Sequence, residues 1–581
     1  MSDTQQRAVE NPQQPTVANT QEDVPFVPFT ALEPHLQRLH DVSIEYILSI
    51  YPKISTRQAS NKTWGDELES QIVTFNPTTK TALPTPIQTH LLQTLPSSSA
   101  DPSVAEPVYH PEFAKYMIES TPPTPYTILP ASLLSVEECL HSRRATIQYK
   151  LQTNEQVLNL SLHPRIGADL LAAQLSPPGS PASSSSTSTS QAQSALDTLI
   201  SPAPYTVAHA SITARHHHTP SISITPFTDT HTSLPPTLTL PHILPGPGAC
   251  GLQATFQCAS LGQARALHDS LTIVAPVLLA LSAATPIYAG VLVDTDARFA
   301  RTGMAVDDRA PGEGVAARWG VPGMYLADAP MEDETRYLDP GHRLGETYVG
   351  RLEEAGMDGV MARYFAAMHG RDPLYVRGEE AEGLSGEAVF RSLCGSDWSA
   401  VRMKIPEPQG AGGWRVEVRV MEVQMRDWEN AGLLVFVALL TRVLMKQGLD
   451  LAIPLPQVRE NMRRAQRRDA VRSERFWWSG GRDGVRELGI REIVLGGEGW
   501  VGLLPLVRGY LDEERVEGEE RAHLERYLDF IGRRASGDEK TAARWIRNFV
   551  QAHPGYKGDS LVSDEVCFDL LRAMAEAEKA G

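Results

Sequence analysis

The residues best suited to chemistry are glutamates that recur in two separate segments. Glu67 and Glu69 lie in "TWGDELESQIVTFN" (63–76), whose alternation predicts a strand. Side chains two positions apart on a strand project to one face, so these two carboxylates share a surface. If that face is buried, a cation is needed to keep both groups ionised; if it is open to water, the pair is an ordinary acidic strand face.

Two more glutamates lie in apolar surroundings. Glu112 and Glu119 fall in "PEFAKYMIESTPPTPY" (111–126), with Phe, Tyr, Met and Ile between them. Acids in such surroundings are costly unless they are paired or bound to a metal. Four carboxylates brought together would suit a hard cation such as Mg²⁺, which takes oxygen ligands and often binds substrate phosphates as well.

A second alternating segment, "GWRVEVRVMEVQM" (413–425), predicts a strand with one charged face. Arg415, Glu417 and Arg419 fall on that face, and Trp414 and the valines fall on the other. Arginines so placed bind carboxylates or phosphates well. The alternative is a ladder of self-paired surface charges, which contributes little.

Other motifs are less specific. The Gly/Pro loop in "LPGPGACGLQATFQ" (244–257) leads into a predicted strand, but no G-K-[ST] follows it as in a nucleotide-binding P-loop. Cys250 in this loop is either a reactive thiol or a small buried residue. A further predicted strand, "VLVDTDARF" (291–299), carries Arg298. The triple histidine 216–218 is a possible metal ligand, but an exposed loop tract is the simpler interpretation.

Composition limits the class of protein. With 70 acidic against 53 basic residues, the net charge is −17, which argues against a nucleic-acid partner because such a protein needs a basic face. Five scattered cysteines without a C-x-x-C pair indicate neither a disulfide framework nor a structural zinc site. The polar, acidic first residues lack the features of a signal peptide. A cytoplasmic protein is therefore expected.

The predicted organisation is a disordered tail (1–25) followed by one domain (26–581). A Ser/Pro-rich stretch at about 176–202 is expected to be a surface loop. The uncharged run 271–293 is long enough to cross a bilayer, but its prolines and its flanking aspartates favour a buried helix that leads into a buried strand. Further helices are expected at 429–446 and, as a basic amphipathic helix, at 456–478.

Taken together, these segments resemble the catalytic subunit of eukaryotic-type glutamate–cysteine ligases (gamma-glutamylcysteine synthetases), from about residue 30 to 565. The segments that carry the resemblance are "WGDELE" (64–69), "PEFAKYMIEST" (111–121), "CGLQATFQ" (250–257), "PVLLALSAATPIYAG" (276–290), "DTDARF" (294–299), "AVDDR" (305–309), "GWRVEVRVMEVQ" (413–424), "RENMRRAQRRDAV" (459–471) and "RASGDEKTAARWIRNFVQAHPGY" (534–556).

The resemblance implies an α+β, glutamine-synthetase-like fold, in which a curved antiparallel sheet backed by helices forms an active-site funnel. It also implies the first step of glutathione biosynthesis. ATP phosphorylates the γ-carboxyl of L-glutamate, and the amine of L-cysteine then displaces phosphate to give γ-glutamylcysteine. Mg²⁺ is the implied cofactor and ATP the co-substrate. No membrane partner is expected, and a smaller modifier subunit is left open.

Site residues follow from the resemblance one by one. Glu67, Glu69, Glu112 and Glu119 match the family's magnesium ligands, and Gln253 matches a further ligand. Glu417 matches an acid at the ATP-bound magnesium, and Arg419 matches the adjacent active-site arginine. Arg298 matches an arginine that contacts the substrate or its phosphorylated form. Tyr325 and Cys250 are assigned to substrate binding by the same comparison.

The chain also departs from the family pattern at four positions near these motifs: Ser70, Ser120, Gly251 and Val420 stand where tyrosine, glycine, cysteine and proline are usual. The predicted metal ligands are unaffected. Two alternatives remain open. One is an inactive homologue that acts as a binding or regulatory subunit, and the other is a related carboxylate–amine ligase with a different amine acceptor.

Overall fold

The computed structural model describes residues 24–96, 106–175, 186–217, 219–310, 317–327, 346–449, 451–479 and 484–579. Most of the predicted disordered tail, 1–25, and residues 176–185 of the Ser/Pro-rich stretch lie outside these residues. The described part of that stretch differs from the expected loop, because Ser186–Asp197 forms helix α6.

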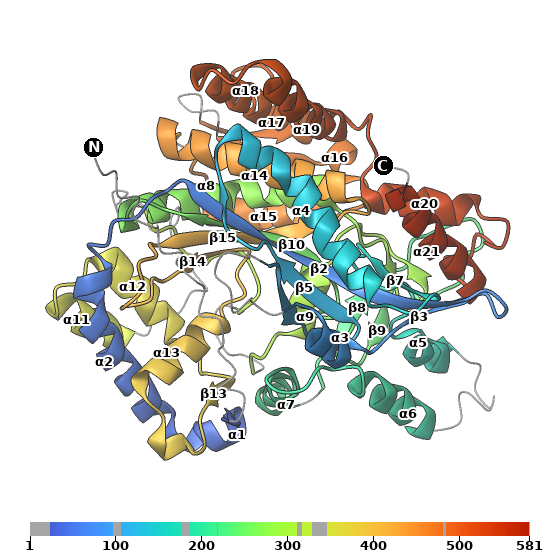
Figure 1. Ribbon diagram of the computed structural model, residues 1–581. Coiled ribbons are helices and arrows are strands. Elements are labelled where there is room, and N and C mark those ends of the chain that lie inside the picture. The colour runs from blue at the N-terminus through green and yellow to red at the C-terminus, as the bar shows by residue number, and fades with distance from the viewer. Residues whose placement is uncertain are drawn as a thin grey trace, which may run out of the picture.

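The centre of the molecule is an antiparallel sheet, with strands of different lengths, that crosses the middle of Figure 1. Its main path is β14 (Val401–Lys404), β15 (Arg415–Glu422), β10 (Gly251–Gln257), β2 (Thr63–Asn76), β5 (Met117–Thr121) and β4 (Val108–Pro111). Strands β3 (Thr81–Pro84), β6 (Tyr126–Thr127) and β7 (Glu155–Leu158) also pair with β2. The long β2 therefore connects most of the sheet, as its 14-residue alternation predicts.

Two apolar helices cover one side of this sheet. Helix α8 (Leu261–Ser282) packs against β15, and α14 (Asp427–Gln447) packs against α8 and β10. Each is long and apolar enough to cross a membrane, but 83% of each apolar window is buried inside the protein. After α8 the chain enters the buried hairpin β11 (Ile287–Tyr288) and β12 (Val291–Leu292). The predicted buried helix leading into a buried strand is confirmed.

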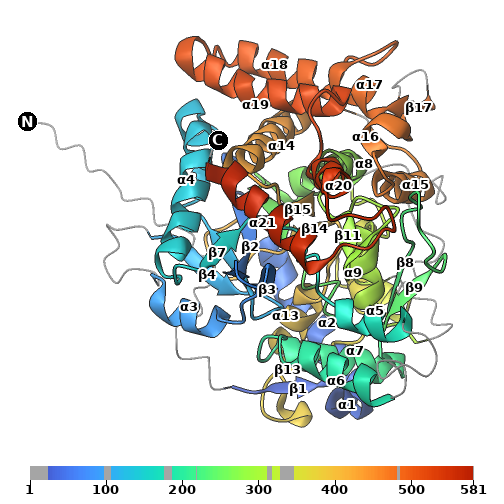
Figure 2. The ribbon, with the colours of Figure 1, turned by 90° about the vertical axis from the view of Figure 1, so that its right-hand side faces the viewer.

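Further helices surround this core. Beside α14 lie α4 (Pro130–Tyr149), which crosses the middle of Figure 1, and α18 (Leu503–Glu513) and α19 (Gly518–Ser536) at its top. On the opposite side of the sheet lie α2 (Leu36–Ile54), α7 (Tyr205–His216), α11 (Glu346–Glu354), α12 (Gly359–Met368) and α13 (Gly386–Gly395). Helices α20 (Ala542–Ala552) and α21 (Asp564–Lys579) lie together at the right-hand side of Figure 1 and face the viewer in the middle of Figure 2. The α+β class and the antiparallel sheet backed by helices agree with the prediction.

The predicted basic helix at 456–478 is wrong in its second half. Helix α15 (Leu455–Ala465) is followed by a short helix, α16 (Ala470–Ser473), and by strand β16 (Arg475–Ser479). The helices are interrupted at Asp469, whose φ of 53° is left-handed.

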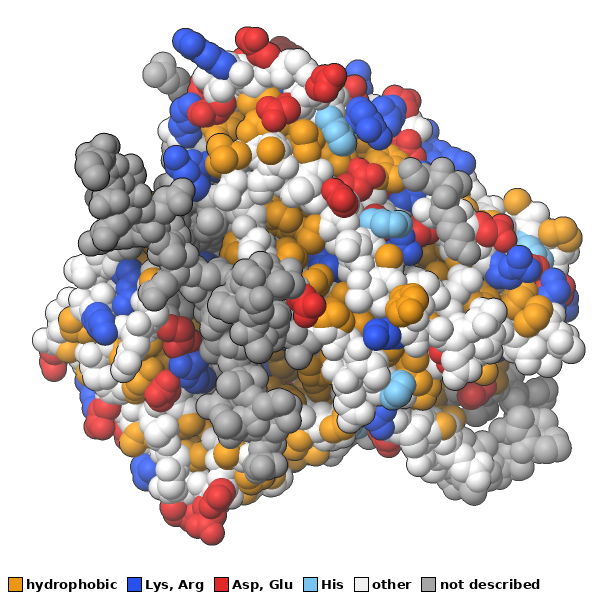
Figure 3. Space-filling view, viewed as in Figure 1, with side chains coloured by type: hydrophobic (Ala, Val, Ile, Leu, Met, Phe, Trp, Pro, Cys, Tyr) orange, Lys and Arg blue, Asp and Glu red, His pale blue; other side chains and the backbone are white. Residues whose placement is uncertain are grey.

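Acidic and basic side chains alternate over α18 and α19 on the face shown in Figure 3, so the described surface there is not a basic face.

Candidate active site

The sheet brings together three of the predicted carboxylates. The register of β2 and β5 places Glu69 directly opposite Glu119, and Glu112 follows the end of β4, the next strand. Oxygen atoms of Glu69, Glu112 and Glu119 all lie within 4.8 Å of one another. Segments about 50 residues apart in the chain thus form a single cluster of oxygens. Glu67, the fourth predicted carboxylate, is not one of the three and pairs instead with Lys404.

The neighbouring strand β10 holds Glu69 in place. The backbone N–H of Gly251 donates to Glu69 Oε2 at 2.7 Å, and Gln253 Nε2 donates to Glu69 Oε1 at 2.9 Å. Gln253 Oε1 is buried and has no hydrogen-bond partner among the described residues. A buried acceptor oxygen without a donor, next to three clustered carboxylates, is the arrangement expected around a cation.

The pKa values of these carboxyls have a common cause. Burial, and then the neighbouring carboxylates, raise the pKa of Glu119 well above its usual range and that of Glu112 to about 8. Burial also raises the pKa of Glu69, although the positive charge of Arg298 opposes it. Without a cation the cluster therefore retains protons at neutral pH. The all-oxygen donor set and the unpaired Gln253 oxygen fit Mg²⁺.

A cationic group lies beside the cluster. Glu417 on β15 is fully buried and forms ion pairs with Arg402, Lys404 and Arg419. Burial alone would raise the pKa of Glu417, but these three cations hold it well below its usual range. Lys404 also contacts Glu67, with Nζ 3.1 Å from Oε1, so this lysine links the cationic group to the carboxylates.

The chain matches the glutamate–cysteine ligase family model over residues 22–577. The chain belongs to the glutamate–cysteine ligase family. It is 31% identical to the glutamate–cysteine ligase of Neurospora crassa, with 93% of this chain and 89% of that protein covered. It is 30% identical to the human glutamate–cysteine ligase catalytic subunit, with 92% of each covered. It is therefore an enzyme of the ligase class.

A solved structure of a glutamate–cysteine ligase from Francisella tularensis in complex with AMP aligns over 90% of each chain, at 12% sequence identity and a TM-score of 0.43.

In this glutamate–cysteine ligase, Arg298 is the residue that immediately precedes helix α9 (Phe299–Ala305). Its Nη1 donates to the backbone oxygen of Ala249 at 3.3 Å, and its guanidinium lies 5.8 Å from the centre of the Trp319 ring. Its charge is the largest one acting to lower the pKa of Glu69. The structure thus places Arg298 beside the carboxylate cluster.

Cys250 and Tyr325 are less well placed for their predicted substrate contacts. Cys250 is fully buried, and burial followed by the charge of Glu69 raises the pKa of its thiol well above the usual range. Of its two interpretations, the small buried residue is the one that the structure supports. The hydroxyl of buried Tyr325 donates to the backbone oxygen of Ile453 at 2.8 Å. A substrate role for either residue stays a prediction.

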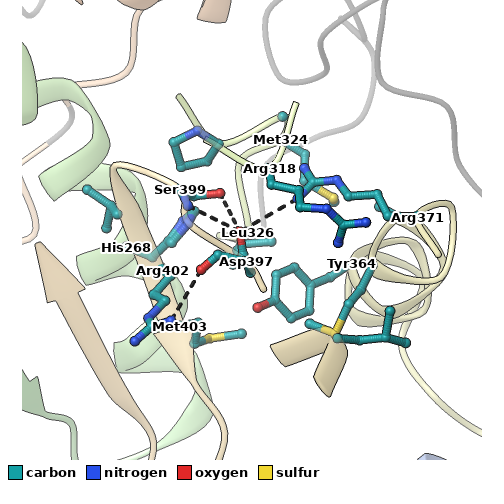
Figure 4. Close-up of a pocket in the computed structure, with 16 residues that line it drawn as sticks. His268, Arg318, Met324, Leu326, Tyr364, Arg371, Asp397, Ser399, Arg402 and Met403 are labelled. Atoms are coloured by element: carbon teal, nitrogen blue, oxygen red, sulfur yellow. Dashed lines mark hydrogen bonds and ion pairs between the residues drawn. The ribbon is translucent and has the colours of Figure 1, made fainter. Parts of the chain in front are cut away.

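A small cavity adjoins the cationic group (Figure 4). Its volume is about 50 Å³, and Arg318, Arg371, Asp397 and Arg402 line it together with methionine, leucine and tyrosine side chains. Arg402 belongs both to the cavity and to the cationic group, because its Nε faces Glu417 and its Nη1 donates to the Asp397 backbone oxygen at 3.2 Å. This arginine connects the cavity with the buried strand β15.

Arg402 and Lys404 were not among the residues predicted from the sequence. Both lie on β14, and this edge strand pairs with β15 so that Arg402 is opposite Glu417 and Lys404 is opposite Arg415. The signal was present in "VRMK" (401–404), where charged and apolar residues alternate as they do in 415–421. Four residues are too few for that alternation to be distinctive by itself.

Proposed function

We propose that this ligase joins the γ-carboxyl of L-glutamate to the amine of L-cysteine at the expense of ATP, and that Mg²⁺ serves at the cluster of Glu69, Glu112 and Glu119. The single observation that carries the proposal is this oxygen cluster, with Glu69 buried and Glu112 and Glu119 half-buried, beside three cationic side chains. Glu67 and Gln253 complete the proposed donor set, and the cytoplasm is the proposed location.

Transfer of a phosphoryl group to a carboxylate brings two anions together. When bound, Mg²⁺ supplies positive charge that neutralises the phosphates and aligns the donor with the acceptor. The carboxylates hold the ion, and the proposed role of Lys404, Arg402 and Arg419 is to balance the remaining negative charge. Glu417 keeps those three cations in place, and direct contact between Glu417 and a second ion stays a prediction.

The proposed role of Arg298 is to bind and orient L-glutamate. A guanidinium presents donors in a planar fork that suits a carboxylate. The charge of Arg298 lowers the pKa of Glu69 more than any other charge does. Once the γ-carboxyl is phosphorylated, a neutral amine is sufficient to displace phosphate. The reaction needs no covalent nucleophile from the protein, which agrees with the buried, protonated thiol of Cys250.

The cavity of Figure 4 is the proposed location of the amine acceptor. Arg371 is buried there and has Asp397 as its ion-pair partner at 3.9 Å, a separation that leaves the guanidinium able to take a carboxylate. Asp397 offers a carboxylate to an ammonium group. The two charges suit the two ends of an α-amino acid, and Met324 and Met403 suit a thiol side chain.

The test is incubation of the purified protein with ATP, MgCl₂, L-glutamate and L-cysteine, with γ-glutamylcysteine detected by mass spectrometry. The expected result is product that requires all four components, with one phosphate released per product. Replacing L-cysteine by L-alanine, L-serine or 2-aminobutyrate tests the alternative acceptor. A preference for one of these amines would replace the proposed acceptor, and absence of product with all of them would favour the inactive homologue.

A further inference from the structure

Glu422 is a buried carboxylate that the reaction described above does not use. It is the last residue of β15, it is fully buried, and it lies opposite Gly251 in the β10–β15 register. Its two oxygens accept hydrogen bonds from three donors: the backbone N–H of Arg298, the backbone N–H of Ala284 at 2.6 Å and the hydroxyl of Thr285 at 2.8 Å. Two loop segments, 284–285 and the residue before helix α9, therefore meet on this carboxylate of β15.

The contact with Arg298 relates Glu422 to the active site. Glu422 accepts from the backbone of Arg298, at the residue where the loop turns into helix α9. The side chain of Arg298 is held mainly by the bond from Nη1 to Ala249, and its Nε has no hydrogen-bond partner among the described residues. The anchored N–H therefore fixes the point on the backbone from which this side chain extends, and the bond to Ala249 holds its far end.

Gly251 lies in direct contact with the guanidinium of Arg298. A Cβ at this glycine would lie 2.1 Å from Arg298 Nη2, so the guanidinium rests directly on the bare backbone of β10. The N–H of the same glycine donates to Glu69 at 2.7 Å. Glu422, Arg298, Gly251 and Glu69 are thus joined in one chain of contacts that leads to the proposed metal site.

We propose that Glu422 is a positioning residue for Arg298: its carboxylate fixes the backbone N–H of Arg298 so that the guanidinium lies against Gly251, beside Glu69, where it receives L-glutamate. The inference rests on the proposed function of Arg298. Burying a carboxylate is unfavourable, and burial raises the pKa of Glu422 to about 7. Three directed donors offset this penalty, and they also restrict the loop to one conformation.

The test measures L-glutamate binding and turnover separately in three variants of the full chain. Glu422→Gln keeps the shape of the side chain but replaces one acceptor oxygen by an NH₂ group that faces N–H donors. Gly251→Ala displaces the guanidinium from the other side. Glu429→Gln is the matched control, because Glu429 is also a buried carboxylate and pairs with Arg534 at 3.3 Å without contacting Arg298.

We expect Glu422→Gln and Gly251→Ala each to raise the KM for L-glutamate about tenfold, the size of one charge-assisted hydrogen bond, while the KM for ATP stays within about twofold. Glu429→Gln is expected to lower the melting temperature and to leave the glutamate KM unchanged. A purely structural role for Glu422 would give Glu422→Gln the same pattern as this control, and an unchanged glutamate KM in both Glu422→Gln and Gly251→Ala would overturn the inference.

Equilibrium dialysis with radiolabelled L-glutamate separates this inference from the proposed function. If the wild type binds glutamate but makes no γ-glutamylcysteine, the proposed function fails, and a tenfold weaker binding in Glu422→Gln still supports the positioning role. If the wild type makes product and the variants bind glutamate normally, the positioning role alone fails. A wild type that neither binds glutamate nor forms product contradicts both.

Discussion

Replacement of Glu119 by glutamine separates metal binding from folding. The carboxyl of Glu119 belongs to the cluster of three whose oxygens lie within 4.8 Å, and its pKa is raised well above the usual range by burial and by the neighbouring carboxylates. In the metal-free protein this burial and the neighbouring negative charges favour the neutral form of the Glu119 carboxyl. Glutamine reproduces that neutral shape, so the melting temperature of metal-free Glu119→Gln should equal that of the wild type.

The melting temperatures of the wild type and of Glu119→Gln should differ once Mg²⁺ is added. At a concentration of 100 times its dissociation constant, a ligand stabilises the folded state by about 2.7 kcal/mol. If the lost carboxylate weakens Mg²⁺ binding about a hundredfold, the same concentration stabilises the variant by only about 0.4 kcal/mol. The loss of an electrostatic stabiliser of the transition state should lower kcat/KM by a factor of about 10² to 10³.

The assay is thermal unfolding with and without MgCl₂, together with initial rates over a range of MgCl₂ concentrations. Glu155→Gln is the matched control, because Glu155 lies on β7 of the same sheet and is 8% exposed, but accepts from the Gln152 backbone at 3.0 Å instead of joining the cluster. The control should keep the wild-type response to Mg²⁺. A Glu119→Gln variant with wild-type rates and wild-type stabilisation by Mg²⁺ would refute the assignment of Glu119.

Three further predictions concern other groups. Lys404→Met should raise the KM for ATP at least tenfold in initial-rate assays, because the lysine pairs with both Glu67 and Glu417. The control Lys446→Met, on the surface, should leave this KM unchanged, and equal effects of the two variants would contradict the charge-balancing role of Lys404. Cys250→Ala should keep kcat within about tenfold because the buried thiol is protonated, and a loss of about 10³-fold or more would point to a direct part in the reaction. Burial and Asp427 raise the pKa of Glu578 to about 8, so the folded protein keeps a proton there that the unfolded chain releases near pH 4.5. Wild-type stability should therefore fall relative to Glu578→Gln as pH rises from about 5 to 8, and melting temperatures that stay parallel over this range would contradict it.

The sequence was most informative where a pattern is long. The alternation over 63–76 and over 413–425 identified β2 and β15 and the faces of their charged residues. The uncharged run at 271–293 identified the buried end of α8, because its prolines and aspartate flanks are unusual for a membrane span. The approach of Glu69 to Glu119 was expected only through the family resemblance, since pairing of β2 with β5 is a tertiary choice.

What the sequence left undetermined depends on short segments and long-range contacts. The helical pattern is interrupted between α15 and α16, where Asp469 is left-handed, and residues 475–479 then form a strand. Glu422 resembles any acid at a strand end until its donors from residues 284, 285 and 298 are brought to it by the fold. The helix over 186–197 contains serine and threonine, which are weak helix formers, so local propensity did not predict it.

The measurement that tests the central claim most directly is anomalous X-ray diffraction from crystals of the protein grown with MnCl₂ and an ATP analogue. Mn²⁺ takes the same oxygen ligands as Mg²⁺ and its scattering identifies it. The account predicts an anomalous peak among Glu69, Glu112 and Glu119, with the Gln253 side-chain oxygen turned toward it. A fully occupied Mn²⁺ site elsewhere, with these three carboxylates unoccupied, would contradict it.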